Sequence, residues 1–473
     1  MDPYGQFDEN VRNAAESFKQ YDKKEVIRLI SHLDADGISA ASIMIKLLNN
    51  DNRKYSVSIV PQLNKTVITQ LASEPYNCFI FTDIGSGLLS EIQALLKGKK
   101  VFILDHHTID ESADFGDIVF VNPHLFGIDG GKEISGAGVV FKFACAVDKI
   151  MEEMAHVAII GALGDLQDQG GFLRLNKEIL DVAVQKNKIN VTKGLRIFGI
   201  QTKALHKALE YCTDPFIPGV SGSESGAIQF LSQIGIDPKN GSGWKKIAQL
   251  DEEEMKKLIT GIIMKRLAEP KPDDVLGNIY ILPHEQEESP TRDAKEFATL
   301  LNACGRLGRA SYGIGACLGD KKIKQQAIRS LTDYKKEIVN ALNWYHENKF
   351  TDDVFWGSRF VIINAKDKVM STMIGTLASI LSKSNVMTNN LFILSMAQAL
   401  DGNTKISLRT TNNIDGRLDL RNIIGEIING IGNSEAGGHQ NAAGAVIPTD
   451  KENHFIQSAK EVLGKYAIIE KIG

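Results

Sequence analysis

Short apolar runs that end in acidic and histidine residues recur through the first third of the chain. The clearest run is Val101–Leu104, which follows the polar turn 98–100. Asp105, His106 and His107 come directly after it. Four apolar residues between polar segments are typical of a strand that is buried on both faces of a sheet. Because open parallel sheets bind ligands at the carboxyl ends of their strands, we expect these three polar side chains at a ligand-binding edge.

Three further apolar runs end in residues of the same kind. They are Val26–Leu33, which contains His32 and is followed by Asp34 and Asp36; Cys78–Phe81, followed by Asp83; and Val157–Gly164, followed by Asp165. The polar residues of the first of these runs occupy alternate positions, so in an extended loop they point to the same side. We place all four runs at equivalent positions in one sheet, where four clusters of Asp and His would meet at one edge. Such a cluster indicates metal chemistry.

Strands and helices alternate along the first part of the chain. Strands are expected at 26–33, 55–60, 76–81, 101–104 and 117–121, and helices between them at 39–48, 65–72 and 88–96. This alternation predicts an α/β fold with a doubly wound, mostly parallel sheet. The pattern then becomes helical at 135–147, 152–164 and 177–185. The second of these helical windows overlaps the run that ends in Asp165, and we keep that run with the other three at the sheet edge.

The pattern changes twice more. From 205 to 288 the alternation of strands and helices stops, and prolines and glycines separate short helical segments. This pattern predicts a helical insertion. A helix with Thr291 as its N-cap is expected at 291–304, and a long polar helix at 321–345 would act as a linker. The predicted domains are a catalytic domain at 1–204, the helical insertion at 205–288, the end of the catalytic domain with the linker helix at 289–351, and a smaller α/β domain at 352–473.

Composition excludes few classes of function. A chain of 473 residues is long enough for two or three domains. The formal net charge of −4 excludes a globally basic nucleic-acid binder, although a local basic groove is compatible with it. The five cysteines are scattered without metal-site spacing, which is typical of reduced packing residues. The sequence has no signal peptide and no stretch of membrane-spanning length, so we expect a cytoplasmic protein without membrane association.

The types of ligand narrow the choice of metal ion and reaction. Mixed Asp and His ligands without Cys suit manganese, magnesium or zinc; several carboxylates favour the harder ions, and imidazole favours manganese over magnesium. Asp83 is a single candidate ligand, and along the chain it lies between two clusters that each have several. Its two carboxylate oxygens can bridge two ions. Two ions about 4 Å apart promote in-line attack on a phosphoester, so phosphoester hydrolysis is the predicted reaction. A single Asp at a strand end is usually an N-cap or a turn residue, and only the joint occurrence of four clusters favours metal binding.

The same residues resemble the signature motifs of the DHH phosphoesterase superfamily. Asp105, His106 and His107 resemble the motif that names the superfamily, and the polar residues of the other three runs resemble the first, second and fourth motifs. Residues 437–444 resemble the glycine–histidine loop of the DHH-associated domain, and 407–410 the serine–arginine strand beside it. Residues 302–307 resemble an element of RecJ exonucleases.

The resemblance implies a role for each of these residues and a pair of divalent cations, with Mn²⁺ preferred and Mg²⁺ as the alternative. The implied ligands are His32 and Asp34 for one ion, Asp36 and His106 for the other, Asp83 as the bridge, and Asp165 to complete the set. Asp105 and His107 would act in catalysis, either behind the ligands or at the scissile phosphate. The residues implied in substrate binding are Asn302, Arg306, Ser407, Arg409, Gly437, Gly438 and His439. Without the resemblance, Arg409 would be interpreted as part of a surface ion pair and Arg306 as a solvated helix end.

The function that the resemblance implies is a metal-dependent exonuclease of single-stranded DNA or RNA in DNA replication or repair, with the two domains closing over the strand. The insertion, and the lack of a further oligonucleotide-binding domain before residue 473, resemble archaeal RecJ-like nucleases that associate with the GINS replication complex. A GINS-type complex is therefore an expected partner beside single-stranded nucleic acid. Two alternatives stay open: a phosphodiesterase for short oligoribonucleotides or cyclic dinucleotides, and a RecJ-like replication scaffold. The preferred sugar and the attacked end also stay open.

Overall fold

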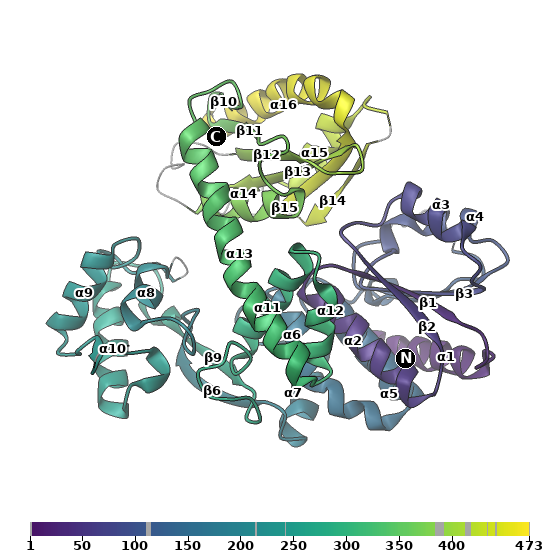
Figure 1. The fold of residues 1–473 in the computed structure, drawn as a ribbon, viewed down its shortest axis with the longest axis horizontal. Helices are drawn as coiled ribbons and strands as arrows, with labels where there is room; N and C mark the ends of the chain where they lie inside the picture. The colour runs from purple at the N-terminus through teal and green to yellow at the C-terminus, as the bar shows by residue number, and fades with distance from the viewer. Residues whose placement is uncertain are drawn as a thin grey trace. The chain divides into compact units, whose positions relative to one another are not determined.

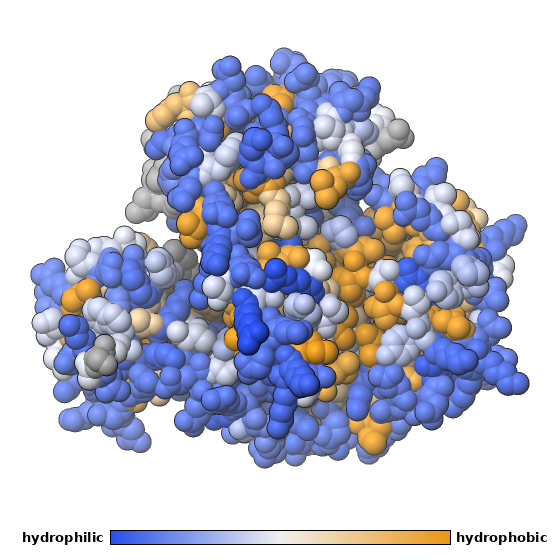
Figure 2. All heavy atoms as spheres, viewed as in Figure 1, coloured by the Kyte–Doolittle hydropathy of each residue, from blue (hydrophilic) through white to orange (hydrophobic). Residues whose placement is uncertain are grey.

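The computed structural model describes residues 2–109, 115–212, 215–241, 243–383, 392–411, 418–432, 434–439 and 442–472. Contacts divide the chain into two compact units, Met1–Leu331 and Thr332–Gly473, each with its own sheet and core (Figure 1). On the face drawn in Figure 2, hydrophilic side chains predominate and hydrophobic ones form smaller patches. Within the described ranges, no helix combines the length and the apolar character that crossing a membrane requires.

The first unit is built on a five-stranded sheet in which every pairing is parallel. Its strands are β1 (Ile27–His32), β2 (Tyr55–Val60), β3 (Cys78–Thr82), β4 (Lys100–Leu104) and β5 (Val119–Val121). Their order across the sheet is β2-β1-β3-β4-β5, so the direction of winding reverses between β1 and β3. Open α/β sheets bind ligands in the crevice at such a reversal, beyond the carboxyl ends of the strands. The predicted α/β fold with a doubly wound parallel sheet is confirmed.

Helices cover both faces of this sheet (Figure 1). Strand β4 shows the division, because Phe102 and Leu104 belong to one apolar core whereas Val101 and Ile103 belong to the other. The first core is covered by α1 (Pro3–Gln20), α2 (Ala35–Asn50), α5 (Gly136–Val147), α6 (Ala155–Gly164), α7 (Arg174–Gln185), α11 (Ala294–Arg306) and α12 (Ala310–Cys317), and the second by α3 (Lys65–Ser73) and α4 (Leu89–Leu95). Burial on both faces explains why these strands are continuous apolar runs.

The apolar run that ends in Asp165 is a helix, so its predicted place in the sheet is wrong. It forms α6, which packs against α2, α5 and α11, and all its residues from Val157 to Leu163 are buried. A helix that is buried on all sides has no polar face, and its sequence pattern then matches that of a buried strand. Asp165 therefore arrives from the end of a helix, whereas the other three clusters follow strands.

The residues between α7 and α11 form an inserted module with its own apolar core, which runs from Leu195 to Val275. Its helices are α8 (Leu205–Glu210), α9 (Glu224–Gln233) and α10 (Glu252–Lys265), and its short strands are β7 (Lys239–Asn240) and β8 (Gly243–Trp244). An antiparallel ribbon of β6 (Asn190–Leu195) and β9 (Leu276–Ile281) leads into and out of the module. These strands were missed, because a ribbon with mostly exposed residues such as β6 lacks the apolar run that marks a buried strand.

The N-cap of helix α11 lies two residues later in the chain than expected. The side chain of Asp293 caps it by accepting hydrogen bonds from the backbone N–H groups of Lys295 and Glu296, so the prediction of Thr291 as the N-cap is wrong. The predicted long helix near 321–345 is confirmed as α13 (Lys321–Asn348). The four domain ranges drawn from the sequence stay predictions.

The second unit contains a six-stranded sheet in the order β10-β11-β12-β13-β15-β14, with helices packed on it. Only β11 and β12 pair in parallel among its described strands. The strands are β10 (Val354–Trp356), β11 (Phe360–Asn364), β12 (Phe392–Gln398), β13 (Asn403–Thr410), β14 (Glu435–His439) and β15 (Ala442–Pro448), and the helices are α14 (Ile374–Ser382), α15 (Leu420–Ile428) and α16 (Glu452–Ile472). This mixed sheet brings the glycine-rich strand β14 beside β15.

Candidate metal centre

The loop from β1 to α2 presents His32 and Asp34 side by side. Asp34 is the N-cap of α2, and its Oδ1 accepts a hydrogen bond of 3.0 Å from the Gly37 N–H. Its Oδ2 lies 2.9 Å from His32 Nδ1. Burial raises the pKa of Asp34, but the positive charge of His32 and their hydrogen bond outweigh it, so the pKa lies below its usual range. One carboxylate oxygen thus caps a helix, and the other faces the imidazole.

Asp36 is fully buried against the N-terminus of α5. The backbone N–H groups of Gly136 and Ala137 donate to its Oδ2 and Oδ1 at 2.6 and 3.0 Å. A helix N-terminus favours a negative charge at this place. Burial nevertheless outweighs the other effects and raises the pKa of Asp36 above its usual value.

Asp83 follows β3 in a left-handed backbone conformation, with φ of 58°. Both of its carboxylate oxygens are buried, and neither has a hydrogen bond of ordinary geometry within the described structure. Burial, followed by the charge of Asp36, raises the pKa of Asp83 well above its usual value. Its Oδ1 lies 3.3 Å from His106 Nε2 and its Oδ2 lies 3.9 Å from His32 Nδ1. Asp83 is therefore the carboxylate that faces both histidines.

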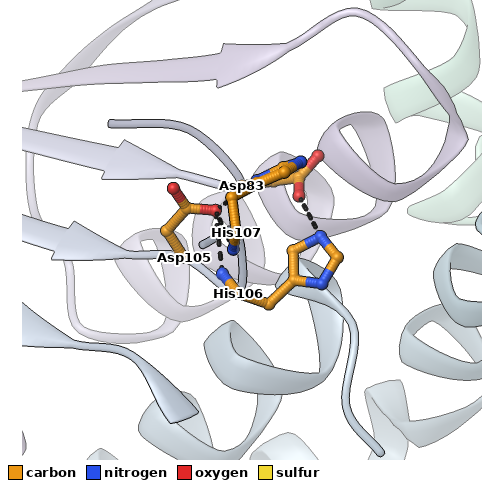
Figure 3. Close-up of side chains that lie close together, drawn as sticks. All are labelled: Asp83, Asp105, His106 and His107. Carbon is orange, nitrogen blue, oxygen red and sulfur yellow. Dashed lines mark hydrogen bonds and ion pairs between the residues drawn. The ribbon is translucent and has the colours of Figure 1, made fainter. Parts of the chain in front are cut away.

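The imidazole of His106 points toward the carboxylate of Asp83 (Figure 3), and the carboxylates of Asp36 and Asp165 lie close to the same ring nitrogen. Besides Asp83, its Nε2 faces Asp165 Oδ2 at 3.4 Å and Asp36 Oδ2 at 3.7 Å. Burial lowers the pKa of His106, but the 3.3 Å contact with Asp83 and the surrounding negative charges raise it well above its usual value. Burial and the charge of Asp36 likewise raise the pKa of Asp165 well above its usual value.

Asp105 and His107 form a pair beside this group. Asp105 Oδ1 lies 2.7 Å from His107 Nδ1 and accepts the His106 N–H at 2.8 Å (Figure 3). Its Oδ2 accepts the Ser86 N–H at 2.9 Å. Burial opposes ionisation of Asp105, but His107 and these bonds hold its pKa below the usual range. The His107 side chain is 37% exposed, whereas that of Asp105 is buried. Asp105 therefore orients His107, which reaches solvent.

Glycines make the close approach of these groups feasible. A Cβ atom at Gly136 would overlap Asp83 Oδ1, and one at Gly161 would overlap Asp36 Oδ1. Neither residue was predicted from the sequence as part of the site. Their signals in the sequence are local: Gly136 directly follows Ser135, the N-cap of α5, and Gly161 lies inside the apolar run that forms α6.

The donors of the cluster fit divalent metal ions. His32, Asp34 and Asp83 form one group whose ligand atoms lie within 4.8 Å of one another, and Asp36, His106 and Asp165 form a second. Carboxylate oxygens with one imidazole nitrogen in each group suit hard or borderline ions. The buried Asp83 and His106 atoms, which have no ordinary hydrogen-bond partner within the described structure, are the groups that a cation would satisfy.

Asn302 and Arg306, which we expected at the substrate, lie at the end of α11. Asn302 Oδ1 accepts a hydrogen bond of 3.1 Å from the N–H of Ala35, the first residue of α2, which lies between Asp34 and Asp36. A Cβ at Gly305 would overlap the Leu33 carbonyl oxygen, so α11 packs directly on this loop. Asn302 thus contacts the ligand loop, and its role at a substrate stays a prediction, as does that of Arg306.

The remaining expected substrate residues come together in the second unit. Ser407 pairs with Gly444 between β13 and β15, and Gly444 pairs with Gly437 between β15 and β14. Arg409 donates to Ser379 Oγ at 3.1 Å and to the carbonyl oxygens of Leu408 and Ala443 at 2.9 and 3.3 Å. Gly438 has φ of 129°, and a Cβ there would overlap the Ala442 carbonyl oxygen. The backbone of His439 belongs to β14, and its side chain lies outside what the structure describes.

Three family models match the chain: "DHH family, N-terminal domain" at residues 26–162, "DHH-CID domain" at 197–279 and "DHHA1 domain" at 358–465. The uncharacterized protein MJ0831 of Methanocaldococcus jannaschii is 32% identical over 448 residues, which cover 93% of each chain. The single-stranded-DNA-specific exonuclease RecJ of Bacillus subtilis is 26% identical over 167 residues, 33% of this chain and 21% of RecJ.

Solved structures share the fold. CDC45 from Entamoeba histolytica has a TM-score of 0.62 at 11% identity, with 98% of this chain and 99% of CDC45 covered. RecJ from Thermus thermophilus in complex with Mn²⁺ has a TM-score of 0.59 at 16% identity, with 96% of this chain covered. The chain spans 55% of the length of that RecJ.

Proposed function

The chain belongs to the DHH superfamily and is RecJ-like, and from this premise we propose that it is a metal-dependent exonuclease of single-stranded nucleic acid. The observation that supports the activity best is the set of buried atoms around His106 Nε2. Oxygens of Asp83, Asp165 and Asp36 lie 3.3 to 3.7 Å from this nitrogen. Without a bound cation, burying these groups together is unfavourable, because each buried charge costs free energy of folding.

We assign the two ligand groups to two divalent cations, with Mn²⁺ preferred and Mg²⁺ as the alternative. The assigned ligands are His32 and Asp34 for one ion, Asp36 and His106 for the other, with Asp83 between them and Asp165 completing the set. When bound, such ions polarise a phosphoryl oxygen and lower the pKa of the attacking water. Thermus RecJ was solved in complex with Mn²⁺ and also with Mg²⁺, which supports divalent cations of this kind, and the imidazole ligands are the reason for preferring Mn²⁺.

The other side chains of the site have separate tasks in this proposal. Asp105 holds the Nδ1 proton of His107, so that the exposed imidazole can hydrogen-bond a phosphate oxygen of the substrate. The helix α5 fixes Asp36 through two backbone N–H groups. In the second unit we assign Arg409, Ser407 and His439 and the backbone of Gly437 and Gly438 to the phosphates of the strand.

The biological setting is also part of the proposal. The single-stranded-DNA-specific exonuclease named in the Bacillus RecJ match supports a single-stranded DNA substrate. In this proposal the enzyme acts in DNA replication or repair, with a GINS-type complex as its partner. The second candidate function is a RecJ-like scaffold without nuclease activity; the chain shares the fold of CDC45 with a TM-score of 0.62. Every candidate ligand position holds an Asp or a His, which favours an enzyme over a scaffold. The RecJ match favours a nucleic-acid strand over a dinucleotide as substrate.

A digest of end-labelled oligonucleotides tests this function. Single-stranded DNA and RNA of about 30 nucleotides, labelled at either end, would be incubated with Mn²⁺, Mg²⁺ or EDTA. We expect stepwise shortening with Mn²⁺ and none with EDTA, and no shortening by Asp83→Ala. The matched control is Asp148→Asn, which changes an exposed Asp at the opposite end of α5 and should digest normally. Shortening of dinucleotides alone would favour the phosphodiesterase, and intact strands in every lane would favour the scaffold.

A further inference from the structure

Behind the metal centre, a hydrogen bond fixes the imidazole of His106. His106 Nδ1 lies 2.7 Å from the carbonyl oxygen of Gly130. A carbonyl oxygen only accepts, so Nδ1 carries the proton of this bond. In the neutral imidazole Nε2 then has the lone pair, and it is Nε2 that faces Asp83 and Asp165. The bond to Gly130 therefore decides which ring nitrogen can bind a cation.

The side chain of Gln167 holds the same carbonyl group. Its Nε2 donates to the Gly130 oxygen at 2.9 Å, and its Oε1 accepts from Asn176 Nδ2 at 2.6 Å. Gln167 is 6% exposed and Asn176 is 1% exposed. Because both ends of the carboxamide are bonded, its orientation is fixed, and Nε2 is directed to Gly130.

Bonds from α7 and from the segment before it support the loop that carries Gly130, in addition to bonds within the loop. Its backbone approaches His106 so closely that a Cβ at Gly130 would overlap the His106 carbonyl oxygen. Gly130 therefore has no side chain with which to anchor itself. A second bond from α7 supports the loop, since the Asn176 N–H donates to the Glu133 carbonyl oxygen at 2.8 Å. Gln167 and Asn176 together tie the loop to the α6–α7 connection.

Gln167 also lies two residues after Asp165. Between them, Leu166 adopts a left-handed conformation with φ of 57° and exposes its side chain. This turn directs Asp165 to His106 Nε2 and Gln167 to the carbonyl group behind His106 Nδ1. The turn 165–167 thus supplies one candidate ligand, Asp165, and through Gln167 it also fixes the orientation of another, His106.

We propose that Gln167 is a positioning residue of the metal centre, which holds His106 through the Gly130 carbonyl group. The inference rests on the proposed function, because it assumes that His106 Nε2 binds a cation. Partners of this kind orient a ligating histidine, and their loss weakens metal binding by about 10- to 100-fold.

Mn²⁺ titration followed by electron paramagnetic resonance of the free ion tests the proposal. Gln167→Leu should weaken Mn²⁺ binding by about 10- to 100-fold. Gln167→Glu keeps the shape of the side chain but places a carboxylate against a carbonyl oxygen, and at about pH 8 it should weaken binding similarly. The matched control is Gln201→Leu, which removes another buried amide, 8% exposed, whose Oε1 accepts from the Glu288 N–H. The control should bind Mn²⁺ like the wild type at a comparable loss of melting temperature.

A second measurement reads the histidine directly. In ¹⁵N-histidine-labelled protein loaded with diamagnetic Mg²⁺, the Nδ1–H signal of His106, assigned with His106→Gln, should be protected from exchange. In Gln167→Leu it should exchange faster, and in Gln201→Leu it should not. Unchanged Mn²⁺ affinity and unchanged exchange in both Gln167 variants would overturn the positioning role alone. A wild-type protein that binds no Mn²⁺ would instead overturn the proposed function, and this role with it.

Discussion

The polar clusters of the two sheets differ in how their groups are satisfied. At the five-stranded sheet, Asp83 and His106 bury polar atoms without ordinary hydrogen-bond partners among the described residues. At the six-stranded sheet, Arg409 is bonded to Ser379 and to two carbonyl oxygens. An unsatisfied buried polar group costs about 1–3 kcal/mol, which a bound cation can offset. A bound cation would therefore stabilise the first cluster, whereas Arg409 in the second cluster already has hydrogen-bond partners, which it can exchange for those of a phosphate.

The two clusters should therefore respond differently to substitution. Changes at the first cluster should act on the chemical step and on Mn²⁺ binding. Changes at the second should act on the affinity for the nucleic-acid strand. Both quantities can be measured for variants of each cluster.

The largest effect is expected for Asp83→Asn. The change removes the carboxylate charge that faces both histidines, and metal ions supply several kcal/mol of transition-state stabilisation. We expect kcat to fall on the order of 10³-fold, with KM for single-stranded DNA nearly unchanged. Steady-state digestion in Mn²⁺ measures both constants. A fall in kcat of less than tenfold would remove the distinction between the clusters.

A smaller loss of hydrolysis rate is expected for Gly136→Ala. Its Cβ would overlap Asp83 Oδ1 and displace the carboxylate, and a misplacement of about 1 Å can cost about 10²-fold in rate. The matched variant in the second unit is Gly437→Ala, whose Cβ meets open space. We expect Gly437→Ala to keep its Mn²⁺ affinity and to change the free energy of unfolding by less than about 0.5 kcal/mol. Equal Mn²⁺ affinities in the two variants would contradict the steric role of Gly136.

A change confined to substrate affinity is expected for Arg409→Ala. Hydrogen bonds to a charged group contribute about 1.5–3 kcal/mol, which corresponds to a rise in KM of roughly tenfold or more. Arg409→Lys should not restore the affinity, because an ammonium group lacks the planar set of donors. Binding of a fluorescent oligonucleotide in Ca²⁺ reports this affinity separately from hydrolysis. Normal binding by Arg409→Ala would exclude a phosphate contact.

The smallest expected effect is the pH dependence of the stabilisation that Mn²⁺ gives to the protein. The folded-state pKa values of Asp83, Asp165 and His106 are raised, so their contribution to stability is present below their ordinary values near 3.8 and 6.5. It is lost as the pH rises through the raised values. Binding of Mn²⁺ requires deprotonated ligands, so the increase in melting temperature with about 1 mM Mn²⁺ should grow by a few degrees between about pH 6 and pH 8. Differential scanning fluorimetry measures the melting temperature with and without Mn²⁺. An increase that is independent of pH would contradict the assignment of these three side chains as cation ligands.

Much of the fold could be predicted because its signals are local. The runs that form β1, β3 and β4 are short and apolar, and each ends in a turn with Asp or His. The parallel sheet follows from the alternation of such strands with helices. The fourth run, which forms α6, could not be assigned in this way, because burial on all sides removes the period that distinguishes a helix from a strand.

The support of the candidate ligands could not be predicted because it depends on distant residues. Asp36 is held by Gly136 and Ala137, which lie 100 and 101 positions further along the chain. Asn302, which the sequence suggested as a substrate residue, bonds to Ala35 across 267 positions. No local pattern in the sequence contains such pairs.

The sequence by itself determined which residue types stand at the ends of the strands, and thereby the sheet and the candidate ligands, since strand period and turn chemistry act over a few residues. The tertiary structure alone decided how those ligands are oriented and which glycines let them approach. The physical reason is that hydrogen bonds and steric overlap act between atoms in space, and the folded chain brings together atoms that the sequence keeps far apart.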